Sequence, residues 1–196
     1  MAGANICGFY DRWSDNLIPN YTTGMANGSS FMYISMGSLA PIQTLVVDLY
    51  NAMGTNVGGD GTTQSGFENG LASYASSKGY GASFQSIKTS STTVDLNALR
   101  TAIYNDKVAV ISLTSYNLVY SITNYDGYVE VTKDNYSVGH MMMVYGYKTI
   151  AYYSGGNNFR TDTYLYVSTG FNSGMRAKVL LGSNLNIIES DIVYIG

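Results

Sequence analysis

The chain of 196 residues has the length of one ordinary domain, and 45% of its residues are hydrophobic, which is enough to form a core. Only 12% are charged, the net charge is -3, and the ten Lys and Arg form no basic run, which argues against a nucleic-acid partner. One Cys and one His exclude an internal disulfide, a cysteine-based zinc site and a histidine-cluster metal site. We therefore expect neither a metal nor a cofactor.

The composition also bears on location. No apolar stretch approaches the roughly 20 residues of a membrane span, so none is predicted. The first residues lack a basic segment followed by an apolar one, and we identify no signal peptide in them. Polarity comes mostly from Ser, Thr, Asn, Gly and 19 Tyr, a surface common on secreted proteins. We expect an extracellular or cell-surface location.

Helical spacing of apolar residues dominates the first half. It predicts a buried amphipathic helix over 2–17, stopped by Pro19. A second helix begins at Pro41, which suits a first helical position, and a third runs from Phe67 to Gly79. The stripes consist of Ile6, Tyr10, Trp13 and Leu17, of Ile42, Leu45, Val46, Leu49 and Met53, and of Phe67, Leu71, Tyr74 and Ala75. A short helix carrying Leu96, Leu99 and Ile103 follows a strand at 82–88.

From Lys107 onward the apolar period changes to two, which is typical of strands. The turn sequence Asn-Tyr-Asp-Gly (124–127) predicts a hairpin between two of them. Helices followed by antiparallel strands predict an α+β fold, a single domain over 1–196 with an N-terminal helical layer packed on a C-terminal antiparallel sheet. The predicted strands after the helices are 108–113, 116–123, 127–133, 140–153, 163–169, 177–181 and 187–195.

The lone histidine, His140, stands in Val-Gly-His-Met-Met-Met-Val-Tyr-Gly-Tyr (138–147) at the start of a predicted strand. An imidazole there is well placed for proton transfer at the end of a sheet. A thiol hydrolase would combine such a base with a cysteine at a helix N-terminus and a third polar residue that orients the ring.

Several segments, in order along nearly the whole chain, resemble the papain-like cysteine peptidases, in the bacterial branch related to the peptidases that process bacteriocin leaders. The most specific is the Gly-His-(apolar run)-Gly-Tyr element. The segments are 8–19, 45–50, 66–74, 107–112, 139–147 and 164–171. The resemblance implies the papain-like fold and thiol-dependent hydrolysis of a peptide bond in a peptide or protein substrate.

The resemblance also assigns roles. His140 matches the catalytic base, and Thr169 stands where the family has an orienting Asn or Asp. In the family the nucleophile belongs to a Cys-x-Pro-Thr motif opening the first helix, which places it a few residues upstream of Met1. The Gln of the oxyanion hole would precede it. The sequence as written contains neither, so we expect this chain to be inactive by itself.

Other residues offer alternatives. Cys7, the only cysteine, is a candidate nucleophile, but a position past the first helical turn favours a buried core residue. Asn172 could replace Thr169 as the partner of His140, although its Gly/Ser surroundings favour a turn. Met141, Met142 and Met143 are explained by a strand covered on both faces.

Two further functional hypotheses remain open from the sequence. The first is a peptidase-like domain that has lost catalysis and serves as a binding or cell-surface module, as Thr169 and the low charge would favour. The second is an unrelated Tyr-rich β adhesin, which would have no helical layer.

Overall fold

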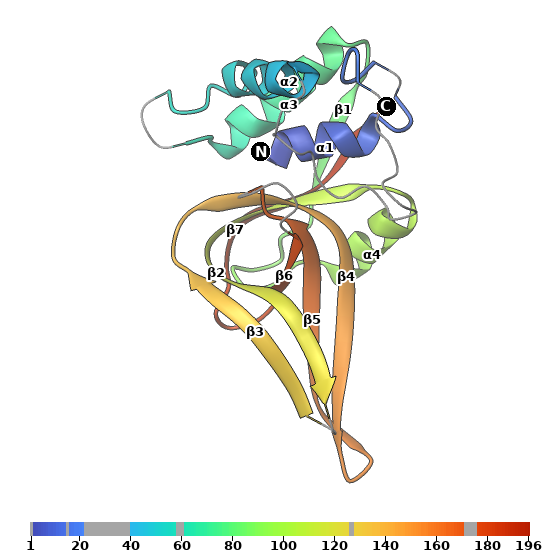
Figure 1. Ribbon diagram of the computed structural model, residues 1–196, viewed down its shortest axis with the longest axis vertical. Helices are drawn as coiled ribbons and strands as arrows, with labels where there is room; N and C mark the ends of the chain where they lie inside the picture. The colour runs from blue at the N-terminus through green and yellow to red at the C-terminus, as the bar shows by residue number, and fades with distance from the viewer. Residues whose placement is uncertain (1, 15, 22–39, 58–60, 126–127, 171–175) are drawn as a thin grey trace.

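The computed structural model describes residues 2–14, 16–21, 40–57, 61–125, 128–170 and 176–196. Three helices, α1 (Ala2–Tyr10), α2 (Ala40–Ala52) and α3 (Gln64–Ser77), gather at one end of an antiparallel sheet, and α4 (Leu96–Tyr104) lies beside it (Figure 1). The predicted α+β class is confirmed. The helical layer is the feature that a Tyr-rich β adhesin would lack.

The sheet has seven strands in the order β1-β7-β2-β4-β5-β6, with β3 paired to β2. All pairs are antiparallel. β2 and β3 form the predicted hairpin, and Tyr125 and Tyr128 are its last paired residues before the turn. β6 returns to β2 through Leu118 and Val179, so β2, β4, β5 and β6 close a ring. The strands are β1 (Ala82–Ser86), β2 (Val108–Tyr125), β3 (Tyr128–Tyr136), β4 (His140–Ser154), β5 (Asn157–Ser168), β6 (Arg176–Leu180) and β7 (Asn186–Ile195).

Alternation along β2 divides the apolar residues into two cores. Val108 and Val110 belong to the first core, between the sheet and helices α1, α2 and α3. Ala109, Ile111 and Leu113 belong to the second, where the ring of strands closes and α4 packs. Successive strand side chains point to opposite faces, so one strand supplies both cores.

The methionine run of β4 follows the same rule. Met143 is fully buried in the first core and Met142 in the second. Met141 is partly buried against the first core. A strand covered on both faces therefore accounts for the run.

The predicted helix over 2–17 is too long, because α1 ends at Tyr10. The backbone then turns, with Asn16 at a φ of 81°, and the Asp11 carboxylate accepts a hydrogen bond of 2.8 Å from the Ile18 backbone N–H. A left-handed residue cannot continue an α-helix, and the Asp11 bond ties the turn in place. Trp13, predicted on the buried stripe, is 54% exposed.

Two glycines of α3 let that helix approach the end of α2 closely. A Cβ added at Gly70 would lie 2.6 Å from the Cα of Met53, and one added at Gly66 would lie 2.6 Å from its carbonyl oxygen. Only a residue without a Cβ fits at either position. This contact fixes the backbone of Met53, which directly follows α2.

Candidate functional site

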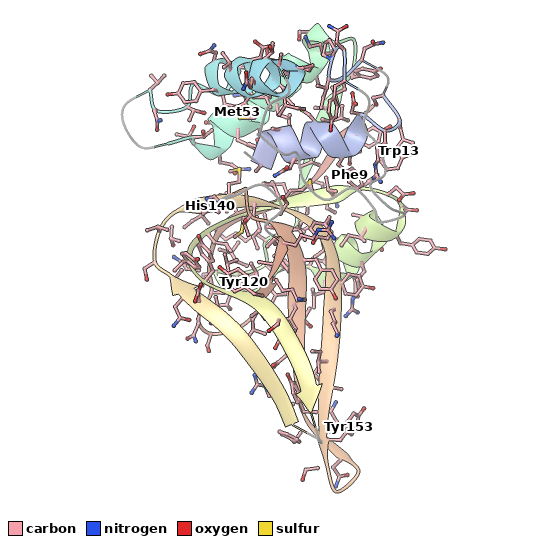
Figure 2. The ribbon with its side chains drawn as sticks, viewed as in Figure 1. Phe9, Trp13, Met53, Tyr120, His140 and Tyr153 are labelled. Atoms are coloured by element: carbon pink, nitrogen blue, oxygen red, sulfur yellow. The ribbon has the colours of Figure 1, made fainter. Side chains whose placement is uncertain are left out.

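A cleft of about 380 Å³ opens between the helical layer and the sheet. Figure 2 shows Met53 on the helical side and His140 on the sheet side, close to one end of α1. The helical layer contributes most of the lining residues, and β2 and β4 with the residue before β4 contribute the rest. They are Ala2, Gly3, Ala4, Val46, Leu49, Tyr50, Met53, Thr55, Gly61, Thr62, Phe67, Ser112, Gly139, His140 and Met141.

His140 is the first residue of β4 and is partly buried in this cleft. Its Nε2 lies 2.5 Å from the main-chain oxygen of Thr169. A carbonyl oxygen only accepts hydrogen bonds, so Nε2 carries the proton and donates it. In the neutral ring the lone pair is then on Nδ1, the nitrogen that can take up a proton.

Burial lowers the pKa of His140 below its ordinary value of 6.5, because partial desolvation disfavours the imidazolium. The hydrogen bond to Thr169 acts in the opposite direction and does not outweigh burial. Burial therefore favours the neutral ring, the form of histidine that can accept a proton.

Thr169 directly follows β5 and is 1% exposed. The register that pairs Met143 with Ser168 brings the end of β5 beside the start of β4. The structure thus brings His140 and Thr169 together, through the threonine's main-chain oxygen. A neutral carbonyl orients the ring but stabilises an imidazolium less than a carboxylate would.

Cys7 lies elsewhere, in the middle of α1. Its side chain is fully buried in the first core. Cys7 is not among the described residues that line the cleft. Burial raises the pKa of the Cys7 thiol far above its ordinary value, and the charge of Asp11 adds to the increase. A thiol that stays protonated is a poor nucleophile, which favours the interpretation of Cys7 as a core residue.

Sequence reasoning missed most of the cleft wall. The apolar pattern places Met53 only on a helical stripe, whereas the structure places it in the wall of the cleft. Thr55 and Thr62 also line the cleft, and their hydroxyls lie 2.6 Å apart, which joins the two ends of a loop. The one available signal was the Gly66-x-x-x-Gly70 spacing in α3, which indicates a close helix contact.

The wall carries little charge. None of the described residues that line the cleft is Asp, Glu, Lys or Arg. The described ranges likewise contain no group of three or more His, Cys, Asp or Glu side chains that could hold a metal ion. Asn172, the alternative partner of His140, lies outside the described residues.

Within the described helices, none is long and apolar enough to cross a membrane. Comparisons with protein-family models, with curated proteins and with solved structures find no match to this chain.

Proposed function

We propose that the cleft is the site of a papain-like cysteine peptidase, with His140 as the general base. The observation that carries this proposal is the hydrogen bond from His140 Nε2 to the Thr169 carbonyl, which holds the ring in the cleft with its lone pair on Nδ1. A neutral ring held in one tautomer, with its lone pair on Nδ1, is the form of histidine that can accept a thiol proton.

The N-terminal end of α1 supports the position of the nucleophile. Ala2, Gly3 and Ala4, the first residues of this helix, line the same cleft as His140. The dipole at a helix N-terminus stabilises a thiolate, and so does a neighbouring imidazolium. A cysteine a few residues ahead of Met1, where the Cys-x-Pro-Thr motif of the resembling family falls, would therefore lie near both.

The reaction would follow the thiol-hydrolase sequence. The thiol gives its proton to Nδ1 of His140, and the thiolate sulfur attacks the peptide carbonyl carbon. The imidazolium then returns the proton to the leaving amine, which departs as the C–N bond breaks. Water, deprotonated by the same imidazole, hydrolyses the thioester and regenerates the thiol.

A grafted cysteine tests this proposal. The chain is extended ahead of Ala2 with Cys-Ala-Pro-Thr in a Cys7→Ser background, and its alkylation by iodoacetamide is followed against pH. We expect the new thiol to react as a thiolate below its ordinary pKa of about 8.5. His140→Ala should shift this pH profile upward, whereas Tyr153→Ala, at the opposite end of the molecule (Figure 2), should not. An alkylation pH profile that is the same with and without His140→Ala would contradict the assignment of His140 as the base.

A second candidate is a binding module on the same fold, and one observation favours it. The partner of His140 is a neutral carbonyl, which supports an imidazolium less well than a carboxylate. Such a module would bind a peptide or protein in the cleft at an extracellular or cell-surface location and release it intact. Mass spectrometry of a bound peptide after long incubation with the grafted chain separates the two functions.

A further inference from the structure

We propose that the cleft selects an uncharged, apolar peptide side chain of medium size, and that Met53 sets the depth available to it. This inference rests on the proposed function only in taking the cleft as a peptide site. It does not require catalysis.

The first argument is the chemistry of the wall. Its helical side is formed largely by apolar side chains, among them Val46, Leu49, Met53 and Phe67. A charged ligand side chain entering there would lose hydration and would meet no opposite charge among the described lining residues. An apolar side chain would instead gain from leaving water.

The second argument is the size of the cleft. Its volume of about 380 Å³ lies near the lower end of the range for ligand sites. That space suits one or two side chains of a short peptide segment. Ser112, Thr55 and Thr62 also line the cleft, and hydroxyl groups can bond the main-chain groups of a peptide.

The third argument concerns Met53 itself. Its backbone is fixed against Gly66 and Gly70, but its side chain extends over Gly3, where an added Cβ would lie 2.6 Å from the methionine Cε. A thioether side chain is unbranched and adapts its shape easily. Met53 therefore forms an adjustable wall on a fixed base, and Gly3 leaves the room in which the methionine tip lies.

The test measures binding of fluorescein-labelled Ala-Ala-X-Ala-Ala peptides to the chain by fluorescence polarisation, with X as Leu, Met, Phe, Lys or Asp. We expect the Leu and Met peptides to bind at least about tenfold more tightly than the Lys and Asp peptides. Equal affinities, tighter binding of a charged peptide, or no binding of any peptide would overturn the proposal.

Variants test the role of Met53. Met53→Ala should deepen the cleft and improve binding of the Phe peptide relative to the Leu peptide. Gly3→Ala should push the methionine tip into the cleft and weaken binding of the Leu, Met and Phe peptides alike. Met53→Leu, which keeps most of the buried volume, provides a folded comparison if Met53→Ala unfolds, and it should also change the Leu-to-Phe ratio. An unchanged ratio in folded Met53 variants would remove Met53 from the proposal.

The matched control is Tyr153→Ala, because Tyr153 is 64% exposed near the tip of the β4–β5 hairpin, far from Met53 (Figure 2). It should leave every affinity unchanged. Failure here is distinguishable from failure of the proposed function. Loss of peptide selectivity with a His140-dependent grafted thiol would contradict only this inference, and the reverse pattern would contradict only the catalytic assignment.

Discussion

The Nε2 of His140 donates a hydrogen bond to the main-chain oxygen of Thr169, and this bond joins the start of β4 to the end of β5. The threonine side chain is not the acceptor in this bond. A backbone group at position 169 therefore orients the imidazole, and residues other than threonine would supply the same carbonyl.

Thr169→Val should accordingly leave the His140 tautomer unchanged. The carbonyl that accepts the Nε2 proton remains, although the buried hydroxyl is lost. Long-range ¹H–¹⁵N NMR of the single imidazole should show a protonated Nε2 and an unprotonated Nδ1 in both proteins. A switch to a protonated Nδ1 in the variant would mean that the hydroxyl, and not the backbone, sets the tautomer.

His140 should also make folding stability depend on pH. Its pKa is lowered in the folded protein because burial disfavours the charged ring, so the unfolded chain binds the proton more tightly. The stabilisation from the neutral ring is fully present above about pH 6.5 and is lost as the pH falls below that value. Urea unfolding at pH 7, 6 and 5 should show this loss, and His140→Gln should remove it. Because the chain has one histidine, an equal loss in the variant would refute this explanation.

Gly70→Ala should destabilise the protein despite the better helix propensity of alanine, which by itself favours Ala by about 1 kcal/mol. The new Cβ would meet the backbone of Met53 at 2.6 Å, and a backbone contact cannot relax cheaply. We expect a net loss of about 1–3 kcal/mol in the free energy of unfolding. Gly139→Ala is the control, since its added Cβ meets no atom within 4 Å. Equal effects of the two substitutions would rule out the close helix contact.

Asp191→Asn should stabilise the protein at pH 7. Gln64 Nε2 donates to both Asp191, at 2.7 Å, and Glu68, at 2.6 Å, so one amide nitrogen serves two carboxylates. Burial raises the pKa of Asp191, and the charges of Glu68 and Glu189 add to the increase, although the Gln64 bond opposes it.

The sign for Asp191 follows from proton binding. The folded state holds this proton more tightly than the unfolded chain, so stability from Asp191 falls as the pH rises from about 4 through its folded pKa. Asp191→Asn should therefore raise the melting temperature at pH 7, and its advantage should shrink on acidification towards pH 4. Asp134→Asn removes one negative charge at an exposed position of β3, outside the cluster around Asp191, and is the control. An advantage for Asp191→Asn that is constant with pH would contradict the titration argument.

The sheet was largely predictable because strand periodicity survives when both faces are covered by apolar residues. Alternation predicted strands over 140–153 and 187–195, close to the observed β4 and β7. The strands predicted at 108–113 and 116–123 form one continuous β2. Its register shifts near Leu113 let the strand bend without ending, and a bend of that kind leaves little trace in an apolar pattern.

The site was less predictable, because its features depend on tertiary contacts. The backbone carbonyl of Thr169 has no sequence signature, since every residue carries one. Leu17 continued the helical spacing of the first apolar stripe, but it is buried by a turn after α1, so the pattern overstated the helix. Met53 lies in the cleft wall because its backbone packs against the glycines of α3, and the apolar stripe of α2 carries no sign of that contact.

The alternating side chains of β2 have a consequence for how the molecule comes apart. Val110 and Ile111 are adjacent in the chain yet lie in different apolar cores. Separating this part of β2 from β4 and β7 would expose both apolar cores to water at the same time. The helical layer and the closed ring of strands are therefore expected to unfold together, in a single cooperative transition.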